Sequence, residues 1–307
     1  MNVIGIDTSN YTTSIAWYDG TTGVNCSQLL PVKLGQLGLR QSDAVFSHTK
    51  SLPELSGRLF SNMRLDQIGG IGVSTRPRAV EGSYMPCFLV GFSHAKLLSD
   101  ALRIPLIEVS HQQGHVAASL WSAGRMELMD QPHLAWHLSG GTTELLLVEP
   151  EGKNVACSKI GGTTDISAGQ LIDRTGQLLQ LPFPSGKHLD ALSLRAERHD
   201  VFRVKCDDCF FSLSGVQNKV QQFYEKNADP AETAAYALRC VAGAVDQATR
   251  QALAQFPGLP VVFSGGVASN SMLRSMMQPL DPVFAQPQYS TDNAMGVAVL
   301  AHRILEG

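Results

Sequence analysis

Two segments of the chain repeat one pattern, and this repeat constrains the fold more than any other sequence feature. Residues 3–18 and residues 134–148 each read as an apolar strand, a short turn and a second strand. The first turn begins with Asp7 and two hydroxyl residues, and the second begins with Ser139 and two glycines. Recurrence of one architectural unit indicates a duplicated organisation. We therefore predict two lobes, each of which opens with a hairpin whose turn faces one shared cleft.

The segments around these hairpins alternate between strand and helix patterns, which is typical of an α/β protein. Residues 104–109 form a short apolar run that predicts a buried strand, and the polar, turn-forming residues 124–132 mark the boundary between the lobes. We predict an N-terminal lobe over residues 1–130 and a C-terminal lobe over residues 131–292. A final helix over residues 293–305 is expected to pack back on the N-terminal lobe.

Composition and charge limit the classes of protein to which the chain can belong. It has 307 residues, of which 44% are hydrophobic and 17% are charged, enough for a large core in about two domains. The formal net charge is −3, and no basic stripe indicates nucleic-acid binding. An RNA substrate would therefore need a local basic patch or a partner protein. No segment reads as a signal peptide or as a membrane span. Six cysteines are ordinary for a reduced compartment, and we expect a cytoplasmic protein.

Two histidines four residues apart, His111 and His115, directly follow the strand predicted at residues 104–109. If a helix begins there, both side chains lie on one helical face near its N-terminus. Two neutral imidazoles at this spacing can reach one metal ion, as they do in zinc proteases. Gln112 stands where such a protease carries its base glutamate, so the residues argue against a protease. The spacing leaves open an incomplete metal site or two unrelated surface histidines.

A metal site would need a third ligand from elsewhere in the chain. Asp292 stands at the start of the last predicted helix and is the candidate, although it could instead serve only as the N-cap of that helix. Two imidazoles and one carboxylate suit Fe(II) or Zn(II).

A second group of polar residues suits an anion or a ribose. The strand over residues 261–264 is followed by Gly265 and Gly266 and then by a helix, and backbone N–H groups at such a helix start can approach an anion. Asp173 lies on a predicted helix, where it is either a solvated residue or a contact to a ligand.

Three local predictions concern smaller features. Residues 43–48 read as a loop before a helix that carries Pro53 in its first turn. Asp165 is expected to cap the helix that follows it. Cys206 and Cys209 form a lone CxxC pair, for which a structural role is favoured over zinc binding or redox chemistry.

Eight short motifs stand in order along nearly the whole chain. They are His111-x-x-Gly-His115, Ser139-Gly-Gly-Thr-Thr143, Asp173, Pro184-Ser-Gly186, Asp190, Phe211-Ser-Leu-Ser-Gly215, Gly265-Gly-Val-Ala-Ser-Asn270 and Thr291-Asp-Asn293. Together they resemble the motifs of the tRNA N6-adenosine threonylcarbamoyltransferase family, formerly called O-sialoglycoprotein endopeptidase. Each motif alone is modest, and the ordered set is specific.

The resemblance implies an actin-like ATPase (ASKHA) fold with two lobes around a central nucleotide cleft. It implies one Fe(II) or Zn(II) ion held by His111, His115 and Asp292. It also implies an acyltransferase that moves the threonylcarbamoyl group of threonylcarbamoyl-AMP to N6 of adenosine 37 in tRNA. The nucleotide bound would be threonylcarbamoyl-AMP or another adenine nucleotide. The implied partners are a dimerising paralogue and a small ATPase. The implied substrate contacts are Leu138, Ser139, Gly140, Gly141, Thr142, Asp173, Gly186, Asp190 and Asn270.

The chain departs from the family pattern at several positions, and the residues suggest no general base. Asn10 and Tyr11 stand where the family carries an acidic pair, and Arg76 and Arg78 stand in place of two glycines. Gln113 replaces a glutamate, and Thr142 replaces a histidine. Two interpretations stay open. The chain is either a working transferase or a non-catalytic adenine-nucleotide-binding paralogue that regulates or scaffolds the true transferase.

Overall fold

The computed structural model describes residues 1–9, 11–31, 39–61 and 67–307, and Asn10 lies outside the described residues. The chain divides into two compact units. The first unit comprises Met1–Gln131, Glu149–Cys157 and Asp292–Gly307, and the second comprises Pro132–Val148 and Ser158–Thr291.

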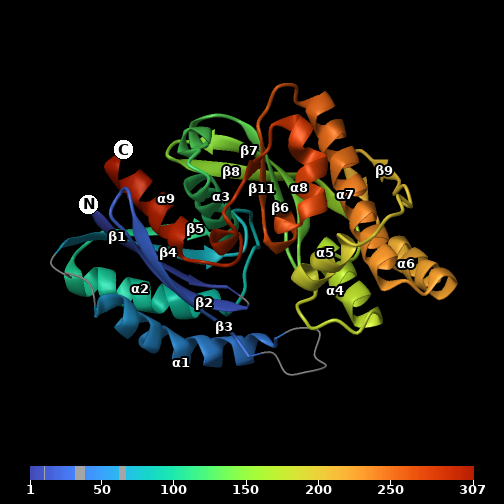
Figure 1. Ribbon diagram of the computed structural model, residues 1–307. Coiled ribbons are helices and arrows are strands. Elements are labelled where there is room, and N and C mark those ends of the chain that lie inside the picture. Colours follow the sequence, from blue (N-terminus) through green and yellow to red (C-terminus); the bar gives the residue numbers. More distant parts are fainter. Residues whose placement is uncertain (10, 32–38, 62–66) are drawn as a thin grey trace. The chain divides into compact units, whose positions relative to one another are not determined.

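The first unit is built around a five-stranded sheet with strand order β3-β2-β1-β4-β5. β1 pairs antiparallel with β2 and parallel with β4. Helices α1 and α2 cover one face of the sheet, and α9 and α3 cover the other (Figure 1). The elements are β1 (Asn2–Thr8), β2 (Thr12–Tyr18), β3 (Gly23–Leu29), α1 (Gln41–Phe60), β4 (Ile68–Arg76), α2 (Phe88–Leu102), β5 (Leu106–Ser110), α3 (His111–Ser122), the 3-10 helix η2 (Met126–Asp130) and α9 (Met295–Glu306).

Helix α1 begins ten residues earlier than the sequence suggested, at Gln41 rather than near residue 51. The prediction of a loop over residues 43–48 was therefore wrong. Ala44, His48 and Leu52 are buried on one face of α1, at the four-residue spacing of a helix. Pro53 lies inside the helix, so the continuous buried face outweighs the breaking tendency of the proline.

The C-terminal helix α9 rests on bare backbone. A Cβ atom added to Gly296 would lie 1.8 Å from the carbonyl oxygen of Gly114 in α3. A Cβ on Gly5 of β1 would lie 2.5 Å from the oxygen of Ala294, and one on Gly72 of β4 would lie 2.8 Å from a backbone oxygen of α9. Only glycine permits such close approaches, so these positions determine where α9 packs against β1, β4 and α3.

Residues 149–157 and Asp292 belong to the first unit, although the sequence placed them in the C-terminal lobe. Two backbone carbonyls explain the position of the hairpin that contains residues 149–157. Gln113 of α3 donates its amide N–H to the oxygen of Val155 (2.7 Å), and Arg303 of α9 donates to the oxygen of Lys153 (3.1 Å). The tip of this hairpin is thus hydrogen-bonded to the helices of the first unit.

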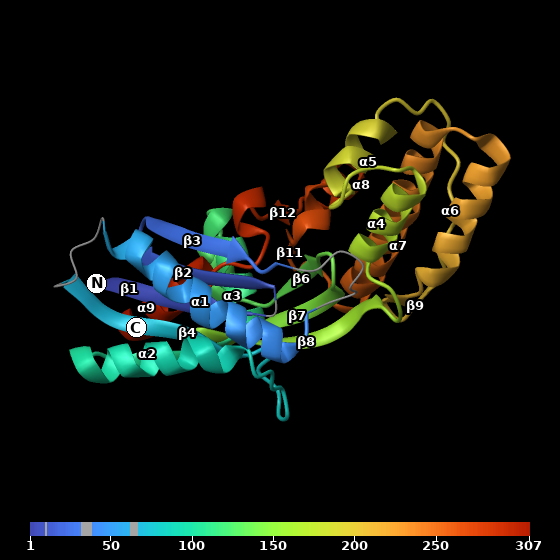
Figure 2. The same cartoon turned by 90° about the horizontal axis from the view of Figure 1, so that it is seen from below.

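The second unit contains a seven-stranded sheet with strand order β12-β11-β6-β7-β8-β10-β9. Its hydrophobic core includes Trp136, Phe263 and the buried face of the long helix α7. Helices α4, α6 and α7 pack against one another (Figure 2). The elements are β6 (His133–Leu138), β7 (Thr143–Glu151), β8 (Asn154–Thr163), α4 (Ala168–Leu178), α5 (Gly186–Ser193), β9 (Cys206–Asp207), β10 (Phe210–Phe211), α6 (Ser214–Asn227), α7 (Pro230–Gln255), β11 (Val261–Ser264), η3 (Gly266–Ser269), α8 (Ser271–Met277), η4 (Gln278–Leu280), β12 (Val283–Phe284) and η5 (Pro287–Tyr289).

Asp165 caps a different helix from the one predicted. The N-cap of α4 is Ser167, whose hydroxyl accepts a hydrogen bond from the N–H of Gln170. The carboxylate of Asp165 instead accepts the N–H groups of Leu213 (2.8 Å) and Ser214 (3.2 Å) at the start of α6. Burial alone would raise the pKa of Asp165, but the hydroxyl groups of Ser212 and Ser214 and these N–H donors hold it well below its usual value.

Among the described residues, no helix combines the length and the apolar character that crossing a membrane requires.

The contact between α3 and α9 can be tested by substitution. Gly296→Ala should lower the free energy of unfolding by about 1–3 kcal/mol, because the new methyl group would force the helices apart. Gly57→Ala is the control, since a Cβ on Gly57 of α1 meets nothing within 4 Å. It should leave stability unchanged or raise it by up to about 1 kcal/mol. Urea unfolding measures both variants, and equal stability of Gly296→Ala and the unmodified protein would contradict the close approach.

Candidate functional site

The two histidines lie on one face of α3 because a capping box sets the start of that helix. The hydroxyl of Ser110 accepts the N–H of Gln113, and the side-chain oxygen of Gln113 accepts the N–H of Ser110 (2.8 Å). His111 is therefore the first residue of α3, and His115 follows one turn later. Their Nε2 atoms lie 2.9 Å apart.

Asp292 lies against both histidines. Its Oδ1 atom is 3.2 Å from Nε2 of His115 and 3.5 Å from Nε2 of His111, and its Oδ2 accepts the hydroxyl of Ser9 (3.2 Å). The N-cap of α9 is Ala294, so Asp292 does not cap that helix. Of the alternatives for Asp292, the structure excludes the N-cap and brings the carboxylate to the histidine pair.

Asp7 lies behind His111 and was not predicted to belong to this cluster. Its side chain is fully buried, and Oδ1 accepts from the hydroxyl of Ser74 and lies 3.0 Å from Nδ1 of His111. Its Oδ2 is buried with no hydrogen-bond partner among the described residues. The only signal for this residue in the sequence was an acid at the end of an otherwise apolar strand.

The pKa shifts of His111 and of the two carboxylates around it favour a charged ring between charged acids. Burial alone would raise the pKa of Asp7, but the neighbouring His111 and the Ser74 hydroxyl hold it below its usual value. Burial would also lower the pKa of His111, yet the carboxylates of Asp7 and Asp292 raise it well above its usual value. Burial similarly opposes ionisation of Asp292, and contacts with the two histidines hold its pKa well below the ordinary range.

The geometry of His111, His115 and Asp292 fits a metal ion. One ligand atom from each residue lies within 4.8 Å of the others. Donors placed about 2.0–2.2 Å from one ion would be about 2.8–3.6 Å apart at neighbouring positions of an octahedral or tetrahedral site. The three observed separations of 2.9, 3.2 and 3.5 Å agree with this spacing. Asp7 faces the other ring nitrogen of His111, as a carboxylate that orients a histidine ligand would.

Asp190 and Asn270 contact each other in the second unit. Asn270 caps α8 by accepting the N–H of Leu273 (2.9 Å), and its side-chain N–H donates to Asp190 (2.7 Å). Ser271, which was not predicted, donates both its hydroxyl (2.8 Å) and its N–H (3.2 Å) to the same carboxylate. These bonds order Asp190 on α5 beside the start of α8.

Asp173 and Gly186 are also neighbours. The carboxylate of Asp173 accepts the N–H of Ser185, the residue before Gly186 (2.8 Å). Burial raises the pKa of Asp173, and the hydrogen bond from Ser185 opposes this shift. Ile172 and Leu189, each adjacent in sequence to one of the two aspartates, share one hydrophobic cluster, so α4 and α5 are packed together.

The turn that contains Ser139, Gly140, Gly141 and Thr142 is tight. Ser139 donates its N–H to the oxygen of Thr142 (2.8 Å), and the hydroxyl of Ser139 accepts the N–H of Thr142 (3.1 Å). A Cβ on Gly140 or Gly141 would meet nothing within 4 Å, so the turn is open at these positions.

The turn packs closely on its neighbours in the second unit. Gly169 of α4 lies against the turn, and a Cβ added to Gly169 would lie only 2.5 Å from the oxygen of Ser139. Gly265 has a φ of +89° and a Cβ there would lie 2.1 Å from the oxygen of Leu138. These two glycines hold the turn between the start of α4 and the end of β11.

The positions that depart from the family pattern have different surroundings. Gln113 is buried in the capping box of α3, so this substitution has a structural role. Tyr11 is 39% exposed, and Arg76 and Arg78 are exposed at and after the end of β4. Thr142 belongs to the tight turn after β6.

Cys206 and Cys209 are buried in the hydrophobic core of the second unit. The side-chain oxygen of Gln251 accepts the N–H of Cys209 (2.8 Å) and is 3.4 Å from the thiol of Cys206. Burial raises the pKa of both thiols. These surroundings agree with the structural role predicted for the pair.

Solved structures establish the class of fold. Full-length HypF in a phosphate- and nucleotide-bound form aligns with a TM-score of 0.62 at 15% identity, covering 100% of this chain and 47% of HypF. An activator of 2-hydroxyisocaproyl-CoA dehydratase from Clostridium difficile aligns with a TM-score of 0.58 at 13% identity, covering 100% of this chain and 96% of that one. A ROK family glucokinase from Streptomyces griseus aligns with a TM-score of 0.54 at 12% identity, covering 99% and 100% of the two chains. The protein therefore has the actin-like ATPase (ASKHA) fold, as predicted.

Sequence comparison identifies the family within this class. The family model for tRNA N6-adenosine threonylcarbamoyltransferase matches residues 38–299. The protein of that name from Carboxydothermus hydrogenoformans is 32% identical over 320 residues, covering 99% of this chain and 93% of that protein. Its counterpart from Thermosipho africanus is 31% identical over 324 residues, covering 99% and 94%. The chain belongs to the tRNA N6-adenosine threonylcarbamoyltransferase family, a family of transferases, which confirms the resemblance seen in its motifs.

The contact between Asp7 and His111 generates a prediction about the metal-free protein. Asp7→Asn should lower the pKa of His111, because an amide cannot supply the negative charge that lies 3.0 Å from Nδ1. A raised pKa in the folded state stabilises the protein below the ordinary histidine value of 6.5, and this stability is lost as the pH rises through the folded-state pKa. The variant should therefore lose part of this pH dependence.

The pKa of His111 can be measured by NMR titration of the imidazole C–H signals in the metal-free protein. Ser74→Ala is the matched control, since it removes the hydroxyl that donates to Asp7 and keeps the charge of that carboxylate. An identical pKa of His111 in Asp7→Asn and in the unmodified protein would contradict the assigned contact.

Proposed function

We propose that this protein is a metal-dependent transferase that moves the threonylcarbamoyl group of threonylcarbamoyl-AMP to N6 of adenosine 37 in tRNA. The observation that carries the proposal is the convergence of His111, His115 and Asp292 in a chain of this family. The proposed partners are tRNA, a dimerising paralogue and a small ATPase. The proposed location is the cytoplasm, where such a tRNA substrate would be available.

His111, His115 and Asp292 would hold one Fe(II) or Zn(II) ion. The ion would supply Lewis acidity toward a phosphate or carbonyl oxygen of the substrate. Asp7 would accept from Nδ1–H of His111 and so leave Nε2 of that ring for the ion. Ser9 would hold the second oxygen of Asp292 and so fix the orientation of the carboxylate.

The second unit would bind the adenylate. Carboxylates accept hydrogen bonds from ribose hydroxyls, and Asp173 and Asp190 are each already oriented by a backbone N–H group. Leu138 and the following turn would approach the phosphate, because Gly140 and Gly141 leave their backbone open. A carbamoyl–phosphate mixed anhydride is already activated, so these residues need to position it more than to attack it.

A non-catalytic, adenine-nucleotide-binding role is the second candidate function. It is favoured by Tyr11, Arg76 and Arg78, which are exposed and replace residues usual in the family. One experiment separates the two candidates. The purified protein is incubated with threonylcarbamoyl-AMP, unmodified tRNA and the partner proteins, and N6-threonylcarbamoyladenosine is quantified. The proposal expects product that requires this chain, and a complete reaction mixture without product would leave only the binding role.

The metal site predicts specific losses of metal. His111→Ala and Asp292→Ala should each remove most of the bound iron or zinc, because two remaining ligands hold an ion poorly. Elemental analysis of the purified variants measures this, and circular dichroism checks that the fold is retained. His199→Ala is the control, since this histidine is exposed and lies in the second unit. Full metal occupancy in either ligand variant would remove that residue from the site.

The adenylate site predicts a loss of nucleotide affinity. Asp190→Ala should weaken binding of AMP by about 1–3 kcal/mol, the range for losing hydrogen bonds to a charged group. Calorimetry measures the affinity. Asp246→Ala is a matched control on the same unit, because that carboxylate is paired with Arg250 on α7. Unchanged affinity in Asp190→Ala would reject the placement of the ribose.

A further inference from the structure

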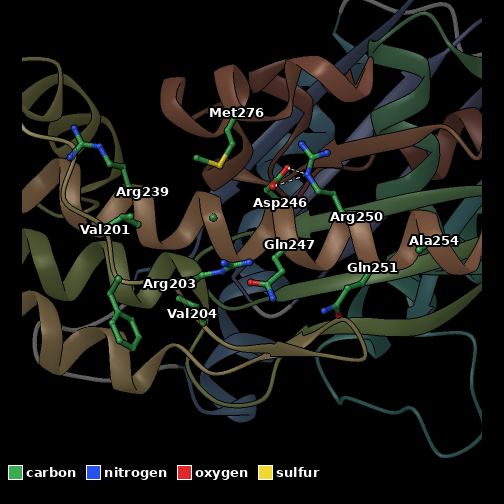
Figure 3. A pocket seen from close by; sticks show the side chains of 12 residues that line it. Val201, Arg203, Val204, Arg239, Asp246, Gln247, Arg250, Gln251, Ala254 and Met276 are labelled. Atoms are coloured by element: carbon green, nitrogen blue, oxygen red, sulfur yellow. Dashed lines mark hydrogen bonds and ion pairs between the residues drawn. The ribbon is translucent and has the colours of Figure 1, made fainter.

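A groove in the second unit is lined by none of the residues assigned to metal or adenylate. One wall is the extended segment over residues 201–204, the other is helix α7, and Met276 of α8 completes the lining (Figure 3). Its volume is about 560 Å³, which is within the range of pockets that bind small molecules. We refer to it as the α7 groove.

The wall formed by residues 201–204 is tied to α7 near both of its ends. The N–H of Phe202 donates to the sulfur of Cys240 (3.3 Å), and Arg239 donates to the backbone oxygen of Asp200 (3.3 Å). Further along, Gln251 donates to the backbone oxygen of Cys206 (3.1 Å). The groove is thus formed before any ligand arrives, which reduces the entropic cost of binding.

The groove has an apolar floor and apolar residues at one end. Val204, Ala254 and Met276 line it, and a Cβ on Gly243 would meet nothing within 4 Å. At one end, Val201 is 53% exposed and Phe202 next to it is also exposed. These surfaces favour a ligand with apolar side chains.

The charged residues of the groove are mainly arginines. Arg203, Arg239 and Arg250 line it together with a single acid, Asp246. Both carboxylate oxygens of Asp246 lie 2.9 Å from Nε of Arg250, so this acid is neutralised (Figure 3). Arg203 has no hydrogen-bond or ion-pair partner among the described residues, and a guanidinium group suits carboxylates. The groove therefore complements an anionic ligand.

The extended wall also offers backbone groups. It leads directly into β9, which is the edge strand of the seven-stranded sheet. Within the part of the chain that the structure describes, the N–H groups of Arg203 and Val204 have no backbone partner. An extended peptide can pair with such a segment while its side chains fill the groove.

We propose that the α7 groove docks an extended, acidic peptide segment of a protein partner. Apolar side chains of the segment contact Val204 and Met276, and its carboxylates pair with Arg203 and Arg239. RNA fits these surfaces less well, because the floor is aliphatic and bases bind mainly by stacking on exposed aromatic rings. The one exposed aromatic ring at the groove, Phe202, lies under the ammonium group of Lys219 at 5.8 Å. The proposal does not depend on the transferase activity.

The test uses the full chain and a defined probe. The probe is a fluorescein-labelled, end-capped peptide of about twelve residues in which glutamate alternates with leucine or phenylalanine. One control peptide carries lysine in place of glutamate, and the other carries serine in place of the apolar residues. Fluorescence anisotropy should give a Kd below about 100 µM for the probe and values at least about tenfold higher for both controls. Higher salt should weaken binding of the probe.

Substitutions then locate the binding site. Arg203→Glu combined with Arg239→Glu should weaken binding of the probe at least about tenfold, and Gly243→Leu should do the same by filling the floor. Lys50→Glu combined with Arg58→Glu, at exposed positions of α1, is the charge-matched control and should have no effect. Thermal unfolding identifies a variant that fails to fold. If Gly243→Leu does not fold, the variant with both arginines replaced decides the test.

Three outcomes would overturn the proposal. The probe could bind no more tightly than the lysine or serine peptide. It could bind equally well to the arginine variant and to the unmodified protein. Alternatively, labelled tRNA could lose affinity in the arginine variant while the probe fails to bind, which would assign the groove to RNA.

Discussion

The crossing of α3 and α9 at Gly114 and Gly296 is the contact on which the rest of the first unit depends. A Cβ at Gly296 would lie 1.8 Å from the oxygen of Gly114, so the two backbones touch without side chains between them. This approach brings the segment before α9, with Asp292, to the histidine face of α3. His115 and Asp292 are separated by 177 positions in the chain, and the bare backbone contact is what makes them neighbours. The same helix packs on Gly5 and Gly72 of the sheet.

Buried charge gives this arrangement its chemical character. Asp7 and Asp292 place two carboxylates around His111, and one oxygen of Asp7 is buried with no partner among the described residues. A buried carboxylate is costly unless a cation or hydrogen bonds compensate its charge. The raised pKa of His111 favours a proton on that ring in the metal-free protein, and a divalent cation would replace this charge. The cluster therefore favours a metal site over two unrelated histidines on a helix.

The sequence predicted the repeated hairpins, the alternating elements and the family, because these depend on local patterns and ordered motifs. It misjudged α1, since the proline at position 53 suggested a start and the buried face beginning at Ala44 was overlooked. It assigned Asp165 to the nearer helix, whereas the fold brings the start of α6 to that carboxylate. Asp7 was missed because its partner His111 is 104 residues away. The sequence showed Gln113 only as a departure from the family pattern. The structure shows that Gln113 forms a capping box with Ser110.

The central claim is that His111, His115 and Asp292 share one metal ion. X-ray absorption spectroscopy of the iron- or zinc-loaded protein tests this claim most directly, because imidazole ligands give a characteristic multiple-scattering pattern. We expect two imidazole nitrogens and additional oxygen ligands, all at about 2.0–2.2 Å. A spectrum that shows sulfur ligands at about 2.3 Å, or no imidazole scattering, would contradict the account.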